Sequence, residues 1–215
     1  MFLFGSCRIW TSIYKYGKSS QQKTIQSHYA DEIIQYIDWL QTKKQLSTEE
    51  IKCFRDTITN NDWSLLKKEF NKSKIFVIEI SSIKTSKSEE GNWQNLLVGK
   101  NAIVDTNISD KIIKINDMLK NKKCIFLCHA NTYSRRNLGF IKNRTIIQDQ
   151  FKQVIKQKDI NFIDPSEIIA KYGQEKCLIL SKKKNSDFKN DIYDLNHYTL
   201  FMHDQVYNNI ISFLD

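Results

Sequence analysis

The stretch Lys74-Ile75-Phe76-Val77-Ile78-Glu79-Ile80 is almost entirely apolar and rich in β-branched and aromatic residues. This composition is typical of a strand that is buried on both faces, as the strands of parallel sheets are. Outward from it, similar short apolar runs occur at residues 1–4, 124–128 and 160–163. The sequence therefore predicts four buried strands, separated by long connections.

The segments between these runs carry apolar residues every three or four positions, which predicts helices. Such spacing is found at residues 28–40, 63–70, 112–119 and 143–156, and again after Thr199. Ser47 and Glu50 form a capping box at a helix start. Ile51, Phe54 and Ile58 follow at helical period, so we expect that helix to continue to about residue 58.

Strands that alternate with helices imply parallel pairing through right-handed crossovers. We therefore expect one α/β domain over residues 1–215, with three layers and a flavodoxin-like, doubly wound parallel sheet in the middle. The polar stretch of residues 85–107 is expected to be a loop or an excursion from this plan. A hydrophobic content of 40% and a charged content of 27% suit such a domain.

The composition also bounds location and partners. No run approaches the ~20 apolar residues of a membrane span, and the apolar start is too short for a signal peptide. The five scattered cysteines favour a reducing compartment, so we expect a cytoplasmic protein without a membrane partner. Lys and Arg exceed Asp and Glu by nine, but they are spread along the chain, which disfavours nucleic acid as the partner. A phosphate-bearing substrate suits the excess equally well, and the oligomeric state stays open.

Polar residues follow three of the predicted strands, at Ser6-Cys7-Arg8, Ser81-Ser82-Ile83-Lys84 and His129-Ala130-Asn131. In open parallel sheets, ligands bind outside the carboxyl ends of the strands. The segment Asp194-Leu195-Asn196-His197 precedes the last helix and could fold over the same edge. A nucleophile needs a base and a group that orients the base. Cys7 or Ser6, with His197 and Asp194, would supply these three roles.

These segments resemble the SGNH (GDSL-like) hydrolase and acyltransferase superfamily. The first block of that family is Gly-Asp-Ser after strand one, and its last block is Asp-x-x-His ahead of the closing helix. Gly5-Ser6-Cys7 places Cys7 where the family has its nucleophilic Ser. This variant is similar to the Cys-bearing branches, namely the Gly-Ser-Cys-Phe-Ala family and the coenzyme A-binding capsular polysaccharide enzymes of the WcbI type.

The resemblance implies Cys7 as nucleophile, His197 as base, Asp194 as its orienting group and Asn131 as an oxyanion donor. Only Asn131 matches the third block of the family, Gly-x-Asn-Asp, and Ser81-Ser82 replaces the Gly of its second block. A substitute donor is therefore needed, for which the amides of Arg8 and Ser82 are candidates. Ser6 is the second choice of nucleophile and otherwise a hydrogen-bonding partner of the substrate.

Substrate-binding residues are expected at the same edge. Arg135 and Arg144 follow Asn131 closely, and arginine binds phosphate through its planar fork. His28 precedes a strong helix and either caps it or lines the site. Cys124, Cys128 and His129 lack a second ligand pair at zinc-site spacing, so no metal is expected. The substrate-binding residues predicted in this way are Ser6, Arg8, His28, Ser81, Ser82, Lys84, Arg135 and Arg144.

Together these features predict an enzyme that transfers an acyl group, most simply acetyl, to a sugar or glycan in polysaccharide or glycoprotein biosynthesis. Acetyl-coenzyme A is the expected donor, no cofactor is expected to be covalently bound, and a sugar, nucleotide sugar or glycan is the expected partner. One alternative is a carbohydrate O-acetyl esterase that uses the same triad. The other is a module that binds a glycan or nucleotide without catalysis.

Overall fold

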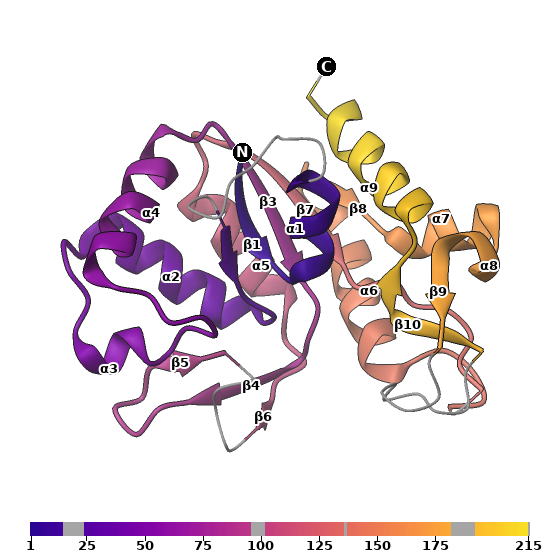
Figure 1. Cartoon of the computed structure of the whole chain (residues 1–215), viewed down its shortest axis with the longest axis horizontal. Helices are drawn as coiled ribbons and strands as arrows, with labels where there is room; N and C mark the ends of the chain where they lie inside the picture. The colour runs from indigo at the N-terminus through magenta and orange to yellow at the C-terminus, as the bar shows by residue number, and fades with distance from the viewer. Residues whose placement is uncertain (15–23, 96–101, 136, 182–191, 215) are drawn as a thin grey trace.

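Five parallel strands form the central sheet of the chain (Figure 1). The computed structural model describes residues 1–14, 24–95, 102–135, 137–181 and 192–214. Within the sheet, neighbours pair in parallel in the order β2-β1-β3-β7-β8, so the strand order reverses between β1 and β3. The strands are β1 (Phe2–Gly5), β2 (Thr24–Gln26), β3 (Ile75–Ile80), β7 (Lys123–Cys128) and β8 (Asn161–Ile163).

Helices cover both faces of this sheet. Side chains alternate along β1, so that Phe2 and Phe4 enter one apolar core while Leu3 enters the other. The first core is completed by α2 (Ala30–Thr42), α4 (Asn60–Lys72), α5 (Ser109–Met118) and α6 (Lys142–Ile155). The second is completed by α1 (Cys7–Tyr14), α7 (Pro165–Tyr172), α8 (Gln174–Cys177) and α9 (Leu200–Ser212). The predicted α/β class, with a parallel sheet between helices, is confirmed.

The capping box at Ser47 is present, but its helix is shorter than expected. Glu50 N donates to Ser47 Oγ at 3.2 Å, and Ser47 N donates to Glu50 Oε2 at 2.9 Å. The helix α3 (Thr48–Ile51) ends after four residues, so the expected continuation to residue 58 is wrong. The chain turns inward there because the Phe54 ring stacks on Tyr36, with ring centroids 4.5 Å apart.

The polar stretch after β3 contains a small antiparallel sheet rather than a plain loop. Its strands are β4 (Lys84–Lys87), β5 (Trp93–Gln94) and β6 (Ile103–Val104), in the order β5-β4-β6. Gln35 of α2 holds this sheet, since its side chain donates to Trp93 O and accepts from Trp93 N, both at 2.8 Å. In Figure 1 the small sheet lies below the helices α2 and α5.

Further elements in the described part of the chain were not predicted. They include the strand β2, the helix α1 that begins directly after the first strand, and an antiparallel pair of β9 (Leu178–Leu180) with β10 (Tyr193–Tyr198). β10 contains the Asp194–His197 segment and leads into α9, whose N-cap is Thr199. No helix in the described part of the chain has the length and apolar character needed to cross a membrane.

Candidate functional site

The segment that carries Cys7 is fixed by Glu79 of β3. A Cβ atom added to Gly5 would lie 2.8 Å from the Cβ of Glu79, so only glycine lets β1 approach β3 this closely. The next amide, Ser6 N, donates to Glu79 Oε2 at 2.8 Å. The helix α1 then begins at Cys7, whose side chain is exposed, whereas Ser6 is only 3% exposed.

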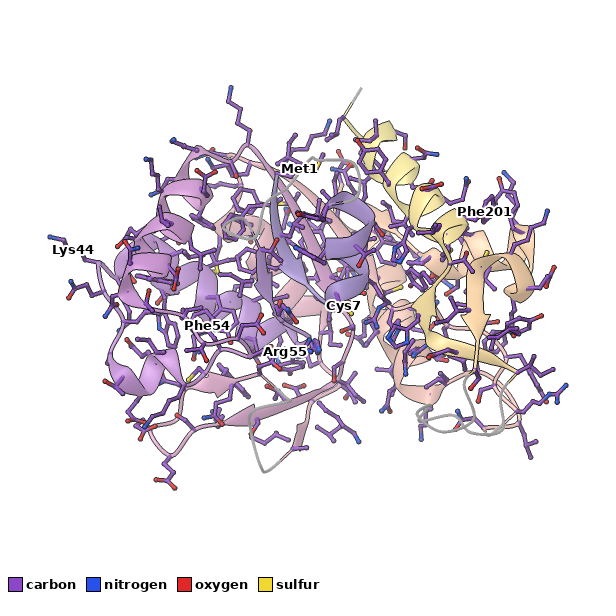
Figure 2. All side chains as sticks on the ribbon, viewed as in Figure 1. Met1, Cys7, Lys44, Phe54, Arg55 and Phe201 are labelled. Atoms are coloured by element: carbon purple, nitrogen blue, oxygen red, sulfur yellow. The ribbon has the colours of Figure 1, made fainter. Side chains whose placement is uncertain are left out.

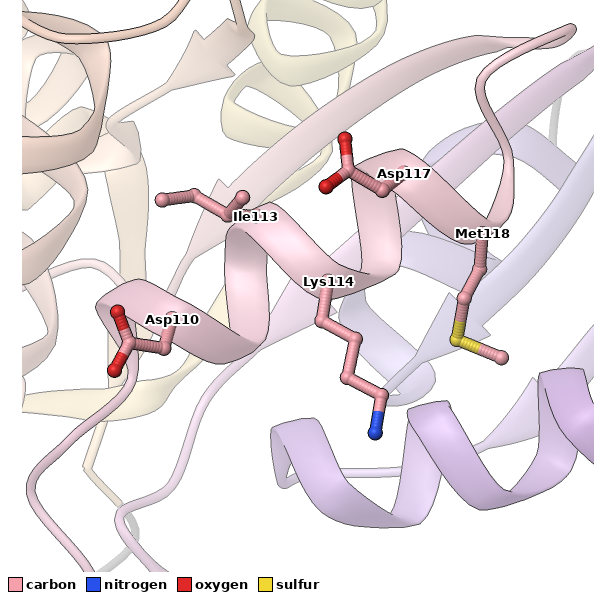
Figure 3. A pocket seen from close by; sticks show the side chains of 5 residues that line it. All are labelled: Asp110, Ile113, Lys114, Asp117 and Met118. Atoms are coloured by element: carbon pink, nitrogen blue, oxygen red, sulfur yellow. The ribbon is translucent and has the colours of Figure 1, made fainter.

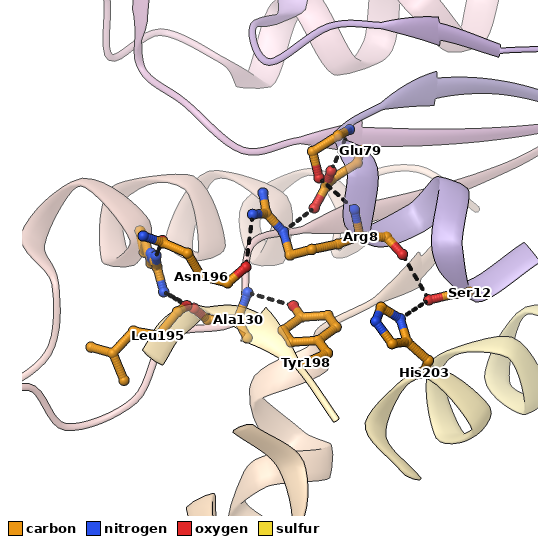
Figure 4. Close-up of polar contacts among 10 residues, drawn as sticks. Arg8, Ser12, Glu79, Ala130, Leu195, Asn196, Tyr198 and His203 are labelled. Atoms are coloured by element: carbon orange, nitrogen blue, oxygen red, sulfur yellow. Dashed lines mark hydrogen bonds and ion pairs between the residues drawn. The ribbon is translucent and has the colours of Figure 1, made fainter. Parts of the chain in front are cut away.

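Arg8 joins this segment to the other end of the chain (Figure 4). Its Nε donates to Glu79 Oε1 at 3.3 Å, and its Nη1 donates to Asn196 O at 3.2 Å. Burial is the largest single influence on the pKa of Arg8 and lowers it, but the electrostatic effects of Glu79, Tyr198 and Cys7 and the hydrogen bond with Glu79 together hold that pKa above its ordinary value. Arg8 is therefore a cation at neutral pH, and its contacts link α1, β3 and β10.

Asp194 and His197 interact within β10. His197 Nδ1 and Asp194 Oδ2 are 2.8 Å apart, and Asn196 N donates to the other carboxylate oxygen, Asp194 Oδ1, at 2.8 Å. The His197 side chain is 58% exposed. This geometry orients the imidazole through Nδ1 and leaves Nε2 for a second partner, as in a catalytic triad.

Arg144 of α6 also holds β10. Its Nη1 donates to Ala130 O at 2.6 Å and to Leu195 O at 3.0 Å, and its Nη2 donates to Asn196 Oδ1 at 2.6 Å. Burial lowers the pKa of Arg144 to about 10. These contacts differ from the phosphate contact that the sequence suggested, because this buried guanidinium ties β10 to the end of β7.

Asn131 lies after β7 as expected, but its side chain is engaged by the protein. Its Nδ2 donates to Thr145 Oγ1 at 2.9 Å and to Gln148 Oε1 at 3.2 Å, while its Oδ1 accepts from Ile141 N at 2.9 Å. Both amide hydrogens are therefore occupied, and the side chain is 4% exposed. These contacts hold the start of α6. An oxyanion donor, in contrast, needs an amide hydrogen that points to the substrate.

Two histidines at the same edge are largely buried and neutral. Burial, reinforced by the positive charges of Arg8 and Arg55, lowers the pKa of His28 to about 4, against a raising effect of Glu79. Burial, with Arg8 and Arg144 nearby, also lowers the pKa of His129 well below its ordinary value. His28 Nδ1 and His129 Nε2 have no hydrogen-bond partner within the described structure. His129 was not predicted as a site residue, although its position directly after a buried strand was a usable signal.

The remaining predicted residues divide into two groups. The amides of Ser81 and Ser82 both donate to His28 O, at 3.0 Å and 2.9 Å, so these residues tie the end of β3 to the start of α2. Lys84 and Arg135 are exposed, on β4 and on the segment between β7 and α6.

Cys7 and His197 lie on segments that Arg8 connects, but the described structure shows no hydrogen bond between their side chains. The structure thus brings together Ser6, Arg8, Asp194 and His197 through a network of contacts. The hydrogen bond expected between Cys7, the predicted nucleophile, and His197, the predicted base, is not formed among the described residues.

Two cavities bear on where ligands could bind. One, of about 470 Å³, has Cys7 on its wall and lies between α1, β2 and the start of α4. The other, of about 540 Å³, is lined by Asp110, Ile113, Lys114, Asp117 and Met118 of α5 alone and includes no residue of the site (Figure 3). Among the described residues, no group of three or more His, Cys, Asp and Glu side chains is placed to hold a metal ion.

One family of known proteins matches the chain. The model of that family, described as the TviD N-terminal domain, matches residues 96–213, which is more than half of the chain. The matched region contains Asn131, Arg144 and the whole of β10, whereas Cys7 and Arg8 lie before it. No curated protein matches the sequence.

Proposed function

Because the chain belongs to the family of the TviD N-terminal domain, we propose that it acts in polysaccharide biosynthesis, as the transferase of an acetyl group to a sugar. Membership of this family supports a role in polysaccharide biosynthesis. The chemistry is supported by the residues at the carboxyl edge of the sheet.

One observation carries the proposal, namely the hydrogen bond from Arg8 Nη1 to Asn196 O. It joins the residue after Cys7 to the residue before His197, across 188 positions of sequence. The Asp194–His197 pair on the far side of this bond has the geometry in which a carboxylate orients a catalytic imidazole. A nucleophile, a base and an orienting group are thus held on connected segments.

The sheet supports an SGNH-like fold. Counted along the chain, its strands have the order second, first, third, fourth and fifth, which is the order of flavodoxin-like sheets. Ligands of such sheets bind where the strand order reverses, at the carboxyl ends. Here that point lies between β1 and β3, where Ser6, Cys7 and Glu79 are found.

In the proposed reaction, the Cys7 thiolate attacks the carbonyl carbon of an acetyl thioester such as acetyl-coenzyme A. His197 Nε2 first takes the proton of the Cys7 thiol. The new bond then joins the acetyl carbon to Cys7 Sγ, the bond to the donor sulfur breaks, and His197 Nε2 gives that proton to the departing thiolate. A sugar hydroxyl then attacks the acetyl-enzyme and loses its proton to His197, and Cys7 leaves as thiolate. Cys7 is preferred over Ser6 because the Ser6 hydroxyl lies in a buried side chain.

Exposed cations at the same edge suit the phosphates of this donor. Lys84 and Arg135 follow the carboxyl ends of β3 and β7 and are both exposed. Phosphate groups bind such cations well, by charge for lysine and through the planar fork for arginine. Arg144 is excluded from this role by its buried contacts with β10.

The proposal is tested by incubating the chain with acetyl-coenzyme A and following acetylation of Cys7 by peptide mass spectrometry. We expect Cys7 of the wild type to become acetylated. In His197→Ala the same acetylation should be much slower, and the four buried cysteines should carry no acetyl group in either protein. One equivalent of coenzyme A should be released as Cys7 is acetylated, and release beyond that equivalent should depend on an added sugar acceptor. Release of acetate without an acceptor would instead identify an esterase, and an unlabelled Cys7 would contradict both reactions.

A second candidate is a module that binds a glycan or nucleotide without catalysis. It is favoured by the engaged amide of Asn131 and by the lack of a Cys7–His197 hydrogen bond among the described residues. This candidate predicts that Cys7→Ala binds the same ligand as the wild type and that neither protein turns it over.

A further inference from the structure

The cavity beside Cys7 is built from three parts of the chain. Its walls come from α1, β2 and the segment that leads into α4. Its volume of about 470 Å³ lies within the range of roughly 300–1,000 Å³ that small-molecule sites have. Figure 2 shows Cys7, which lines this cavity, and Arg55 near the centre of the view.

An aromatic surface forms one wall. The Trp10 ring stacks on Tyr14, with centroids 4.8 Å apart and planes 13° apart, so it is held as a flat face. Trp10 follows Cys7 by less than one helical turn, and both residues line the cavity. A flat, amphipathic ring of this kind packs against the apolar face of a sugar at a small cost in conformational entropy.

The opposite wall supplies hydrogen-bonding groups. Gln26 Oε1 accepts from Arg55 Nη1, which fixes the side-chain amide, and its two amide hydrogens have no partner among the described residues. The Asp56 carboxylate has no partner among the described residues. Asp62 uses Oδ2 to cap α4 through Thr59. Carboxylate and amide groups in this pattern can receive and give the hydrogen bonds of sugar hydroxyls.

The charge of this lining differs from that of the chain as a whole. The chain has a formal net charge of +9, but the cavity is lined by Asp56 and Asp62 and by no Lys, Arg or His among its described residues. Arg55 donates to the neutral amide of Gln26 beside the cavity and offsets one of these two charges, so the described residues around the cavity keep a small negative excess. An anionic ligand would be repelled by the two carboxylates, whereas an uncharged one would not.

We propose that this cavity binds the acceptor of the transfer reaction and that the acceptor is a sugar unit without negative charge. The role of this sugar as acceptor rests on the proposed function. The binding of an uncharged sugar beside Cys7 rests on the cavity alone. The donor, whose phosphates would meet Asp56 and Asp62 here, must then approach Cys7 from the β10 side.

The test compares the methyl glycosides of N-acetylglucosamine and glucuronic acid, with binding measured by saturation-transfer NMR on the full chain. We expect the uncharged glycoside to bind at least about tenfold more tightly than the uronate. Asp56→Lys should narrow or reverse this difference. The matched control is Asp117→Lys on α5, which makes the same charge change outside the cavity.

The aromatic wall is tested separately. Trp10→Ala should weaken binding of the uncharged glycoside by about tenfold, and Trp10→Tyr, which keeps a ring, should restore most of it. Circular dichroism of each variant checks that the fold is intact. Binding that is equal for both glycosides, absent for both, or unchanged in Trp10→Ala would overturn the inference.

The outcomes separate the two proposals. If the uncharged glycoside binds through Trp10 and Asp56 but no acetyl transfer occurs, the sugar site stands and the proposed transferase activity fails. If Cys7 is acetylated and acetyl reaches an acceptor whose KM is unchanged by Trp10→Ala and Asp56→Lys, the transferase stands and the assignment of this cavity fails.

Discussion

The two segments of the proposed site are held in place by different means. Residues 5–8 are built into the central sheet, because Gly5 packs against Glu79 and Ser6 N donates to the same side chain. Residues 194–197 belong to a two-stranded sheet outside it and are held by the guanidinium groups of Arg8 and Arg144.

Cys7, the proposed nucleophile, and His197, the proposed base, are therefore positioned by different contacts. The carbonyls of Leu195 and Asn196 and the side chain of Asn196 all accept from arginine, while the His197 ring itself remains exposed. The arginines therefore hold the backbone of this segment, while Asp194 holds the imidazole ring. Catalytic hydrogen bonds are often long in a free enzyme and tighten when substrate binds, which accommodates the unmade contact between His197 and Cys7.

The largest effect is expected from the pair within β10. Asp194→Asn should lower kcat of acetyl transfer by about 10²- to 10⁴-fold, because an amide cannot hold the imidazole in the tautomer that leaves Nε2 as the base. Steady-state kinetics with acetyl-coenzyme A measures this. The unfolding free energy should change little, since β10 is held by the arginines, and a kcat equal to that of the wild type would refute the triad.

Removing the connection between the two segments should chiefly affect stability. Arg8→Met leaves the buried Glu79 carboxylate without its cation, which should lower the unfolding free energy by about 3–5 kcal/mol in urea denaturation. The double variant Arg8→Met with Glu79→Gln should recover much of this loss, because the amide oxygen of Gln can still accept from Ser6 N. Equal losses in the single and double variants would show that the ion pair is not the cause.

Burial of His28, which lies between β2 and α2, should also make stability depend on pH. The pKa of His28 is about 4 in the folded chain, below its ordinary value, so between about pH 6.5 and 4 the unfolded chain binds a proton that the folded chain does not. Stability is therefore lost as pH falls, by about 2 kcal/mol from this residue at pH 5.

His129 acts in the same direction. Urea denaturation at pH 7 and pH 5 should show a smaller loss in His28→Gln than in the wild type, and identical losses would contradict the assignment.

The smallest effect is expected at the end of β10. Thr199 Oγ1 accepts from Met202 N at 3.2 Å and caps α9, so Thr199→Ala should cost about 1 kcal/mol in thermal or urea unfolding. Acetyl transfer at a temperature where the variant is folded should be unchanged, because the arginines and not the cap position His197. A loss of kcat larger than tenfold would show that the cap also holds the base.

The sequence was most informative where structure depends on neighbouring residues. The runs at 75–80 and 124–128 became β3 and β7, and the capping box at Ser47 starts the helix that it indicated. Propensity and capping act over a few residues, so they can be read from the sequence directly. β2 (Thr24–Gln26) has a single apolar residue, so no apolar run marks it, whereas the equally short β8 lies in such a run.

The candidate site was predicted in part for the same reason. Cys7, His197 and Asp194 belong to short motifs, but the bonds of Arg144 and Asn131 depend on residues brought near them only by the fold. Glu79 was missed, although a charged residue inside an apolar strand has to be paired when it is buried. Its pairing with Arg8 and Ser6 N shows that this single carboxylate was the strongest unused signal.

The bond between Arg8 and Asn196 also has a consequence for the time course of folding. Contacts between residues 188 positions apart close a very long loop, and loop closure of this kind slows folding more than it affects stability. The central sheet can pair before this loop closes, since β3 pairs with β1 and with β7 without β10. Catalytic competence should therefore appear later in refolding than secondary structure, as a separate and slower phase.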